Sequence, residues 1–160
     1  MATAKKPSAK KTVQPGEATA ILRADRKLVS DLFEEFEGAR SSAKKSKIVA
    51  QICRELTVHA EIEEEIFYPA VKAPLKDKEL VPEATVEHAT LKDLIAQVEG
   101  VEPDGEMYDA KVKVMGEYVK HHVKEEQNEM FPKVKATKLD MFALGEKMLA
   151  RKQELMAARI

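Results

Sequence analysis

Residues 59–69 read HAEIEEEIFYP, and residues 122–132 read HVKEEQNEMFP. Both stretches follow the pattern His-x3-Glu-x5-Pro, and the second begins 63 residues after the first. The segments before them repeat as well, because residues 25–33 (DRKLVSDLF) align with residues 87–95 (EHATLKDLI) at an offset of 62. The chain therefore reads as one helical hairpin used twice, and this repeat predicts both the fold and the place of a polar site.

Apolar residues recur every three or four positions over four long stretches, and no stretch alternates with a period of two. The seven prolines fall in or next to the gaps between these stretches, where a missing amide donor does not disturb a helix. Ser41 or Ser42 and Asp104 are the expected N-caps of two helices. The helices are predicted over residues 17–39, 42–68, 82–99 and 104–131. Mostly short connections between them favour an all-α fold, an up-down-up-down four-helix bundle.

Two further segments flank this bundle. Residues 1–16 hold four lysines, two prolines and a glycine, and they predict a disordered basic N-terminal tail. Residues 140–160 have an amphipathic pattern and predict an accessory helix that packs on the bundle. The expected organisation is a tail over residues 1–16, a bundle over 17–133 and a C-terminal accessory helix within 134–160.

The composition narrows the class of protein. The chain has 160 residues, of which 44% are hydrophobic and 34% charged, as expected of a folded domain rather than a disordered or membrane protein. Its 27 basic and 28 acidic residues give a net charge of −1, so no bulk field favours nucleic acid or an anionic membrane. A single cysteine, Cys53, excludes an internal disulfide and a cysteine-based zinc site. We expect a cytoplasmic protein, because no apolar run suits a signal peptide or a membrane span.

A polar residue interrupts the core-facing stripe of each predicted helix. These residues are Arg26, His59, Glu63, His88, His122 and Glu126. An unpaired polar group costs about 1–3 kcal/mol in a protein core, so polar residues on the core-facing stripes of all four helices indicate a common function. Because the second hairpin repeats the first, pseudo-twofold symmetry brings the interruptions to one depth in the bundle.

The residue types at this depth favour a metal site. A His and a Glu four positions apart share a helix face, so each copy of the motif offers one imidazole and one carboxylate to the same point. Nitrogen and oxygen donors without thiolate suit iron or manganese, with zinc as another choice. A single His-x3-Glu pair is common on solvated helix faces, but two copies with matching prolines favour a metal site. The most specific hypothesis is a dinuclear non-haem iron site. No histidine of this chain has a glutamate three positions before it, so the Glu-x-x-His pattern of ferritin-like bundles is absent.

With these motifs the sequence resembles the hemerythrin-like, or HHE cation-binding, family over about residues 20–133. The resemblance implies a four-helix bundle around a non-haem di-iron centre. It also implies that His59, His88 and His122 are terminal ligands and that Glu63 and Glu126 are bridging ligands. Members of the family bind or react with dioxygen, peroxide or nitric oxide, or take part in iron sensing and stress responses.

Two positions depart from the family pattern. Oxygen-carrying members have a second histidine where this chain has Lys92, which argues against reversible oxygen transport. Arg26 stands where both the family and the internal repeat call for histidine, and arginine is always charged and a poor metal ligand. We expect its guanidinium to pair with the carboxylates Glu63 and Glu126 and to replace one iron, which leaves one metal or none. Alternatively, Arg26 swings aside and opens a coordination position, or the helix rotates so that it reaches water; Asp25 as a substitute ligand is a lesser alternative.

Other residues near the motifs receive simpler interpretations. His121 points about 100° away from His122, so a role as ligand or ligand support is a minor alternative. The acidic residues Glu61, Glu64 and Glu65 lie off the seam and predict a solvated face. Four residues are expected to close the bundle end below the carboxylates as packing and a dry wall: Phe67, Tyr68, Met130 and Phe131.

The sequence thus predicts a hemerythrin-like non-haem iron-binding protein whose di-iron site is weakened by Arg26. The expected partner is a small diatomic ligand or peroxide, with no nucleic acid and no membrane. A metal-free helical bundle, in which Arg26 closes the polar core of a structural or partner-binding module, is the alternative. An enzyme that decomposes peroxide at the iron is a third hypothesis.

Overall fold

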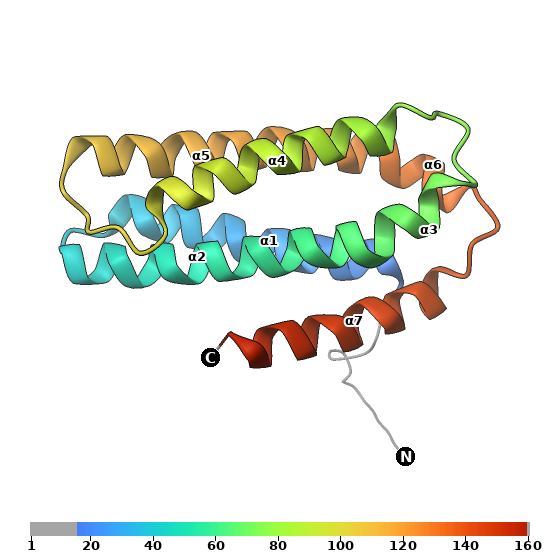
Figure 1. The fold of residues 1–160 in the computed structure, drawn as a ribbon, viewed down its shortest axis with the longest axis horizontal. Coiled ribbons are helices and arrows are strands. Elements are labelled where there is room, and N and C mark those ends of the chain that lie inside the picture. The colour runs from blue at the N-terminus through green and yellow to red at the C-terminus, as the bar shows by residue number, and fades with distance from the viewer. Residues whose placement is uncertain (1–15, 160) are drawn as a thin grey trace, which may run out of the picture.

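A computed structural model describes residues 16–159. Most of these residues are helical, and no strand occurs among them, which confirms the predicted all-α class. The expected basic tail lies outside the described residues except for Gly16. Four long helical arms run up and down in sequence, and a further helix packs beneath them (Figure 1).

The arms correspond closely to the predicted helices. The first is α1 (Ala18–Gly38), and the third is α4 (Leu80–Val98). The second and fourth arms each change helix type along their length. The second consists of α2 (Ser42–Ile62), the π-helix η1 (Glu63–Phe67) and α3 (Tyr68–Lys72). The fourth consists of α5 (Glu106–Glu125), the π-helix η2 (Glu126–Met130) and α6 (Phe131–Lys135).

The second and fourth arms run past the prolines that were expected to end them. Pro69 and Pro132 lie within the first two residues of α3 and α6, directly after the π turns. In each π turn the amide after the turn donates to the carbonyl five residues back, from Tyr68 to Glu63 and from Phe131 to Glu126. This wider turn accommodates a proline ring that would disturb an ordinary α-helix.

Two expected N-caps have different outcomes. Ser41 caps α2, as predicted, and its hydroxyl accepts a hydrogen bond from the amide of Lys44. The prediction that Asp104 caps the fourth arm is wrong, because Gly105 holds the cap position with a φ of 113°. Only glycine adopts such a backbone angle without strain.

The interior of the bundle is divided into two apolar clusters. One surrounds Phe67 and Phe131 at the end where the π turns lie, and the other surrounds Ile52 and Met115 at the opposite end. Along α1, Leu22 belongs to the first cluster and Val29 to the second, with Arg26 between them. The polar residues predicted from the seams therefore lie in a layer with apolar packing on both sides.

The expected accessory helix is α7 (Met141–Ala158), capped by Asp140 through a hydrogen bond from the amide of Ala143. It lies beside the first hairpin and packs on α1, α2 and η1 (Figure 1). Met148 is fully buried there and belongs to the apolar cluster around Phe67. The helix thus covers one half of the bundle and leaves the other uncovered.

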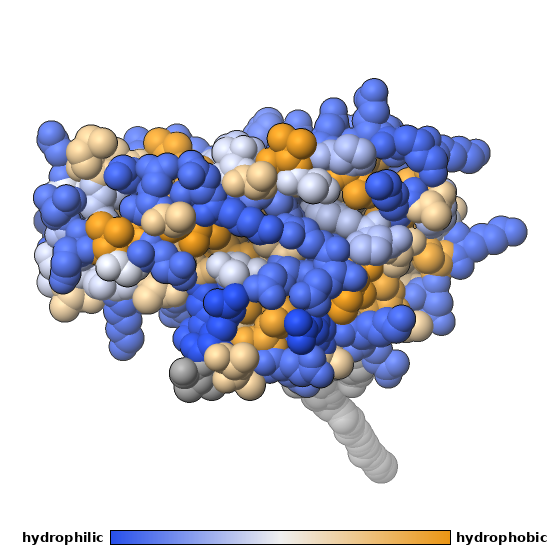
Figure 2. Space-filling model, viewed as in Figure 1, coloured by the Kyte–Doolittle hydropathy of each residue, from blue (hydrophilic) through white to orange (hydrophobic). Residues whose placement is uncertain are grey.

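The outer surface is mainly polar. In Figure 2 hydrophilic side chains cover most of the visible face, and apolar surface appears in strips between helices. Among residues 16–159, no helix is both long enough and apolar enough to span a membrane.

Candidate metal centre

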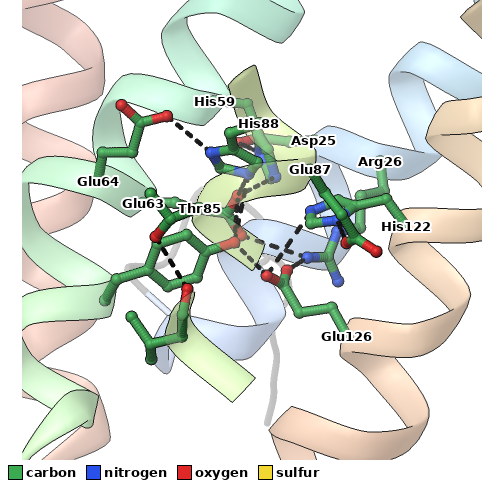
Figure 3. A network of polar contacts seen from close by, with 12 residues as sticks. Asp25, Arg26, His59, Glu63, Glu64, Thr85, Glu87, His88, His122 and Glu126 are labelled. Carbon is green, nitrogen blue, oxygen red and sulfur yellow. Dashed lines mark hydrogen bonds and ion pairs between the residues drawn. The ribbon is translucent and has the colours of Figure 1, made fainter. Parts of the chain in front are cut away.

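Each of the four arms sends polar side chains into the layer between the apolar clusters (Figure 3). The residues come from α1 (Arg26), α2 (His59), η1 (Glu63), α4 (His88), α5 (His122) and η2 (Glu126). Glu63 is fully buried, and His88 and Glu126 are only 2% and 4% exposed. Both carboxylates are the first residue of a π turn, a feature that is often found at functional sites. The structure therefore brings every predicted site residue to one depth.

Three of these residues form the tightest group. One ligand atom each of Glu63, His88 and His122 lies within 4.8 Å of the others, as metal ligands must. His59 and Glu126 border this group: His59 Nε2 is 3.5 Å from Glu63 Oε1, and His122 Nε2 is 3.8 Å from Glu126 Oε2. The role of these five residues as ligands stays a prediction, but their placement fits it.

Each of the three inner histidines is held from outside by a carboxylate. His59 Nδ1 lies 3.0 Å from Asp25 Oδ2, and His88 Nδ1 lies 2.7 Å from Glu64 Oε2. His122 Nδ1 lies 2.5 Å from Glu87 Oε1. When Nδ1–H of a neutral imidazole donates to such a carboxylate, the Nε2 lone pair is turned inward, which is the usual way in which proteins orient histidine ligands.

The sequence pattern did not indicate this role for Asp25, Glu64 or Glu87. The internal repeat held part of the signal, because Asp25 and Glu87 occupy equivalent positions directly before Arg26 and His88. Each of the two acids holds a histidine on the next arm of its own hairpin, as Figure 3 shows for Glu87 and His122. The expectation that Glu64 lies on a merely solvated face is therefore wrong.

The guanidinium of Arg26 lies between the two predicted bridging carboxylates. Its Nη2 is 3.3 Å from Glu63 Oε2 and also contacts Glu126 Oε1. Arg26 is 7% exposed, and its guanidinium lies over the ring of Phe131, 4.6 Å from the ring centre. The alternatives in which Arg26 reaches water or swings aside from the carboxylates do not describe this structure. Asp25 points away from the centre toward His59 and Lys152, so it does not substitute as a ligand.

Tyr68 has a more central place than expected. Its hydroxyl lies 3.3 Å from Glu63 Oε1 and 3.2 Å from His88 Nε2, and it donates a hydrogen bond to Glu126 Oε2. Burial and the charge of Glu63 raise the pKa of Tyr68 well above its usual value, so the hydroxyl keeps its proton. Tyr68 is therefore a polar member of the centre and not only part of an apolar wall. Its counterpart in the repeat is Phe131, which carries no hydroxyl.

The electrostatics differ between the histidines of the two His-x3-Glu motifs. Burial lowers the pKa of His59, but the charge of Glu63 and hydrogen bonds to Asp25 and Glu63 outweigh this effect and raise the pKa to about 9. Burial lowers the pKa of His122 to about 4, although Glu63 opposes the shift, and the positive charges around it add to the lowering. His59 is thus an imidazolium at neutral pH and His122 a neutral imidazole, the form that binds metals.

Unsatisfied buried atoms provide a test of whether a metal ion fits here. His122 Nε2 is buried and has no hydrogen-bond partner, although His122 Nδ1 is held by Glu87. A buried imidazole nitrogen without a partner costs free energy that a bound cation would recover. Glu63 is ionised, because His59 and His88 hold its pKa well below the usual range despite complete burial. A neutral imidazole with a free lone pair beside a buried carboxylate fits a divalent ion.

Two spaces adjoin the centre. A small cavity of about 20 Å³ lies against His59, His88 and His122 and is otherwise lined mainly by apolar side chains. A cavity of this size holds one water or another molecule of similar size. A wider groove of about 950 Å³ runs between α1 and α5, reaches Arg26 at its inner side and is lined by Phe33 and Gly116 among others. A molecule of about the size of water therefore has a chamber beside the histidines, and a separate groove reaches Arg26.

The remaining predicted positions lie outside the centre. His121 is exposed, lies 3.5 Å from Glu125 and approaches the outer carboxylate Glu87, so it lies outside the centre itself. Lys92 pairs with Glu64 at 2.7 Å, on the side of that carboxylate away from His88. Glu61 and Glu65 were also expected on a solvated face; Glu65 is exposed and pairs with Arg151 of α7, and the half-buried Glu61 pairs with Arg159 directly after α7.

These observations define a helical bundle with a buried histidine and carboxylate centre, and comparisons with known proteins agree with this class. The model of the hemerythrin HHE cation-binding domain matches residues 17–134. The chain belongs to the hemerythrin HHE cation-binding domain family.

Two individual proteins are similar to this chain. The crystal structure of a hemerythrin HHE cation-binding domain-containing protein from Mycobacterium kansasii matches 89% of either chain with a TM-score of 0.78 and 24% identity, which supports the fold. A DNA nickase of Nostoc sp. is 28% identical over 115 residues, 72% of this chain but 32% of the nickase. The chain thus spans about a third of the length of that relative.

Proposed function

We propose that this protein is a hemerythrin-like metal-binding protein that holds one divalent metal ion, iron, at Glu63, His88 and His122. In this proposal the guanidinium of Arg26 takes the place of the second ion of a di-iron centre. The observation that carries it is the contact of Arg26 with both Glu63 and Glu126, the two carboxylates that would otherwise bridge two metals. A fixed positive charge at that point repels a second cation and balances the charge of the carboxylates without it.

The donor set supports iron as the ion. Two histidines and one carboxylate with open positions form the ligand set of many non-haem iron(II) proteins. Iron bound in this way supplies open coordination positions at which dioxygen, nitric oxide or peroxide bind. The cavity of about 20 Å³ beside the three histidines is suited to a ligand of that size.

The residues of the chain have separate tasks in this proposal. Glu64 and Glu87 orient His88 and His122, so that both Nε2 atoms face the ion. The hydroxyl of Tyr68 lies within hydrogen-bonding distance of Glu63 and His88 and donates its proton to Glu126, so it would hold these side chains in place around an ion. The apolar clusters on both sides keep bulk water away and strengthen each electrostatic contact in the layer.

A metal-free structural or partner-binding module is the second candidate, and the same position of Arg26 favours it. With Arg26 paired to Glu63 and Glu126, the layer contains its own cation and does not need a metal to balance the two carboxylates. The two candidates differ in whether the unpartnered His122 Nε2 and the ionised Glu63 bind an added ion.

Metal analysis of the purified protein and two variants separates these functions. The protein is loaded anaerobically with iron(II), passed through a desalting column and analysed by mass spectrometry of the elements. We expect one iron per wild-type chain and two per Arg26→His chain, because the substitution restores the histidine that the repeat calls for. Arg23→His, one turn earlier on α1, is the matched control and keeps one iron.

Each stoichiometry has a definite meaning. Two irons in the wild-type protein contradict the replacement of an ion by Arg26. No iron in the wild-type protein supports the metal-free module. If one iron is present, adding nitric oxide to the iron(II) protein tests for open coordination through the spectrum of the complex. Peroxide consumption, compared between wild type and His122→Ala, then tests for an enzyme.

A further inference from the structure

We propose that the C-terminal helix α7 is part of the metal centre, because Lys152 holds Asp25, which holds His59 against the metal-binding carboxylate of Glu63. Docking of α7 and binding of the ion then strengthen each other. This inference rests on the proposed function, since it concerns the site at Glu63, His88 and His122. It adds a positioning residue that is far away in the sequence and lies outside the repeated hairpins.

The contacts form a continuous chain from the surface to the centre. Lys152 Nζ lies 2.5 Å from Asp25 Oδ1, and the other oxygen of the same carboxylate lies 3.0 Å from His59 Nδ1. The opposite ring nitrogen of His59, Nε2, lies 3.5 Å from Glu63 Oε1. Four side chains from α7, α1, α2 and η1 are thus joined in series.

Because Asp25 is more deeply buried than Lys152, its position in this series of contacts depends on Lys152. The Asp25 side chain is 5% exposed, while that of Lys152 is 25% exposed. Without Lys152, Oδ1 of the buried Asp25 carboxylate loses the one cation that contacts it among residues 16–159, and such a carboxylate turns toward water or other donors. Because Asp25 fixes the ring of His59, a movement of Asp25 also frees the ring that contacts Glu63.

The position of α7 is fixed by close backbone contact as well as by charge. A Cβ atom at Gly145 would lie 2.3 Å from the carbonyl oxygen of Gly16 at the start of α1, so this position requires glycine. Arg151 and Arg159 pair with Glu65 and Glu61, which belong to the same arm as His59 and Glu63. The helix therefore docks on the arm that supplies the metal-binding carboxylate.

The second hairpin provides an internal comparison. Glu87, the counterpart of Asp25, holds His122 at 2.5 Å, yet no lysine or arginine pairs with Glu87 among residues 16–159. Only the first hairpin therefore depends on α7 for the support of its histidine. This asymmetry predicts that changes in α7 disturb His59 and leave His122 unaffected.

The experiment measures the iron(II) affinity of the full chain by competition with a chelator. Outer supporting residues of metal sites typically change affinity by about 10–100-fold, and we expect Lys152→Met to weaken iron binding by about tenfold. Lys152→Arg keeps the charge and rescues most of the affinity. Lys147→Met, at an exposed lysine of α7 that forms no ion pair among residues 16–159, is the matched control and changes the affinity by less than about twofold.

A double-mutant cycle distinguishes positioning from general loss of structure. In the Asp25→Asn background Lys152→Met has no further effect, because the link through Asp25 is already broken. In the metal-free protein, nuclear magnetic resonance of the imidazole nitrogens shows a shift for His59 and none for His122. Coupling also requires that bound iron slow hydrogen exchange in α7, and by the same free energy.

The outcomes separate the inference from the function on which it rests. If the wild-type protein binds iron and Lys152→Met binds it equally well, the inference fails and the proposed function stands. If the effects of Lys152→Met and Asp25→Asn add, Lys152 does not act through Asp25 and the inference fails. A wild-type protein that binds no iron contradicts both.

Discussion

The two hairpins of the bundle share a plan and differ at a few positions. In both, an acid on the first arm holds a histidine on the second, a glutamate begins a π turn, and a proline follows the turn. In the first hairpin, however, position 26 is arginine, whereas its counterpart in the second hairpin is His88. The histidine beside Arg26, His59, is also positively charged, while His122 is neutral. One half of the centre thus supplies fixed positive charge, and the other supplies His122 as a neutral nitrogen donor.

The neighbours of position 26 differ in a matching way. Arg26 lies over the ring of Phe131, and its counterpart His88 lies beside the ring of Tyr68, with ring centres 5.3 Å apart. Glu64 supports His88, and the repeat places Gln127 where an equivalent support for residue 26 would lie. The difference between the halves is therefore a set of compatible changes around one position and not a single isolated substitution.

Removing the fixed charge gives the largest expected effect. Arg26→Met leaves Glu63 and Glu126 as a buried pair of carboxylates without their cation, and we expect a loss of about 3–5 kcal/mol in the free energy of unfolding. The measurement is urea unfolding in the presence of a chelator. Arg23→Met, on an exposed position of α1, is the control and changes stability by less than about 0.5 kcal/mol. Equal stability of Arg26→Met and wild type would show that the carboxylates do not depend on Arg26.

The charged and neutral histidines predict opposite pH dependence of the metal-free protein. The raised pKa of His59, about 9, gives stability that is complete below the unfolded value of about 6.5 and is lost as the pH rises toward 9. The lowered pKa of His122, about 4, gives stability that is complete above about 6.5 and is lost as the pH falls toward 4. Each of these two losses of stability amounts to at most about 3–4 kcal/mol.

Urea unfolding across pH 4 to 9 with chelator tests this contrast. We expect His59→Gln to reduce the loss of stability at alkaline pH and His122→Gln to reduce the loss of stability at acidic pH. The pKa of His88 is also raised, because contacts with Glu63 and Glu64 outweigh burial. His88 therefore also contributes to the loss of stability at alkaline pH. Identical profiles for the two variants would contradict the assigned charges.

The hydroxyl that distinguishes Tyr68 from Phe131 predicts a smaller effect. Tyr68→Phe removes the hydroxyl beside Glu63, His88 and Glu126 and should lower the stability of the metal-free protein by about 1–3 kcal/mol. Tyr108→Phe, at a tyrosine of similar burial in the distant apolar cluster, should change it by less than about 0.5 kcal/mol. Both are measured by urea unfolding, and an equal loss in the two variants would remove the special role of Tyr68.

The smallest effect is expected at the groove between α1 and α5. Gly116 lines this groove, and its counterpart in the first hairpin is the fully buried Cys53. In Gly116→Ala the added methyl lies 3.0 Å from the ring of Phe33, which borders the groove and has room to shift. The gain in helix propensity then prevails, and stability rises by up to about 1 kcal/mol. A loss of stability on urea unfolding would show that Phe33 cannot move.

Much of the fold was predictable because it depends on local patterns. The period of the apolar residues, the repeat and the loop positions predict the four arms and the accessory helix, and the structure confirms them. The π turns were not predictable from these patterns, because an extra residue in one turn changes the apolar spacing only slightly. They explain why the arms continue through Pro69 and Pro132.

The candidate centre was predictable only for residues on the helix seams. The inner histidines and glutamates lie on stripes that must face the core, so their spacing revealed them. Lys152 supports the centre from a separate helix, and no period within that helix indicates which residue it meets across 127 positions of sequence. Tyr68 resembled an apolar packing residue in sequence, because its hydroxyl gains a role only through the partners that folding brings to it.

The layer of charge between the two apolar clusters also affects how the molecule opens. Neither cluster is continuous with the other, so each end of the bundle has a core of its own, joined through ion pairs and hydrogen bonds. Such ends can unfold as separate cooperative units whose amides exchange with different free energies. An ion bound in the layer would tie these units together, and its release would let the end that carries α7 fluctuate independently of the other.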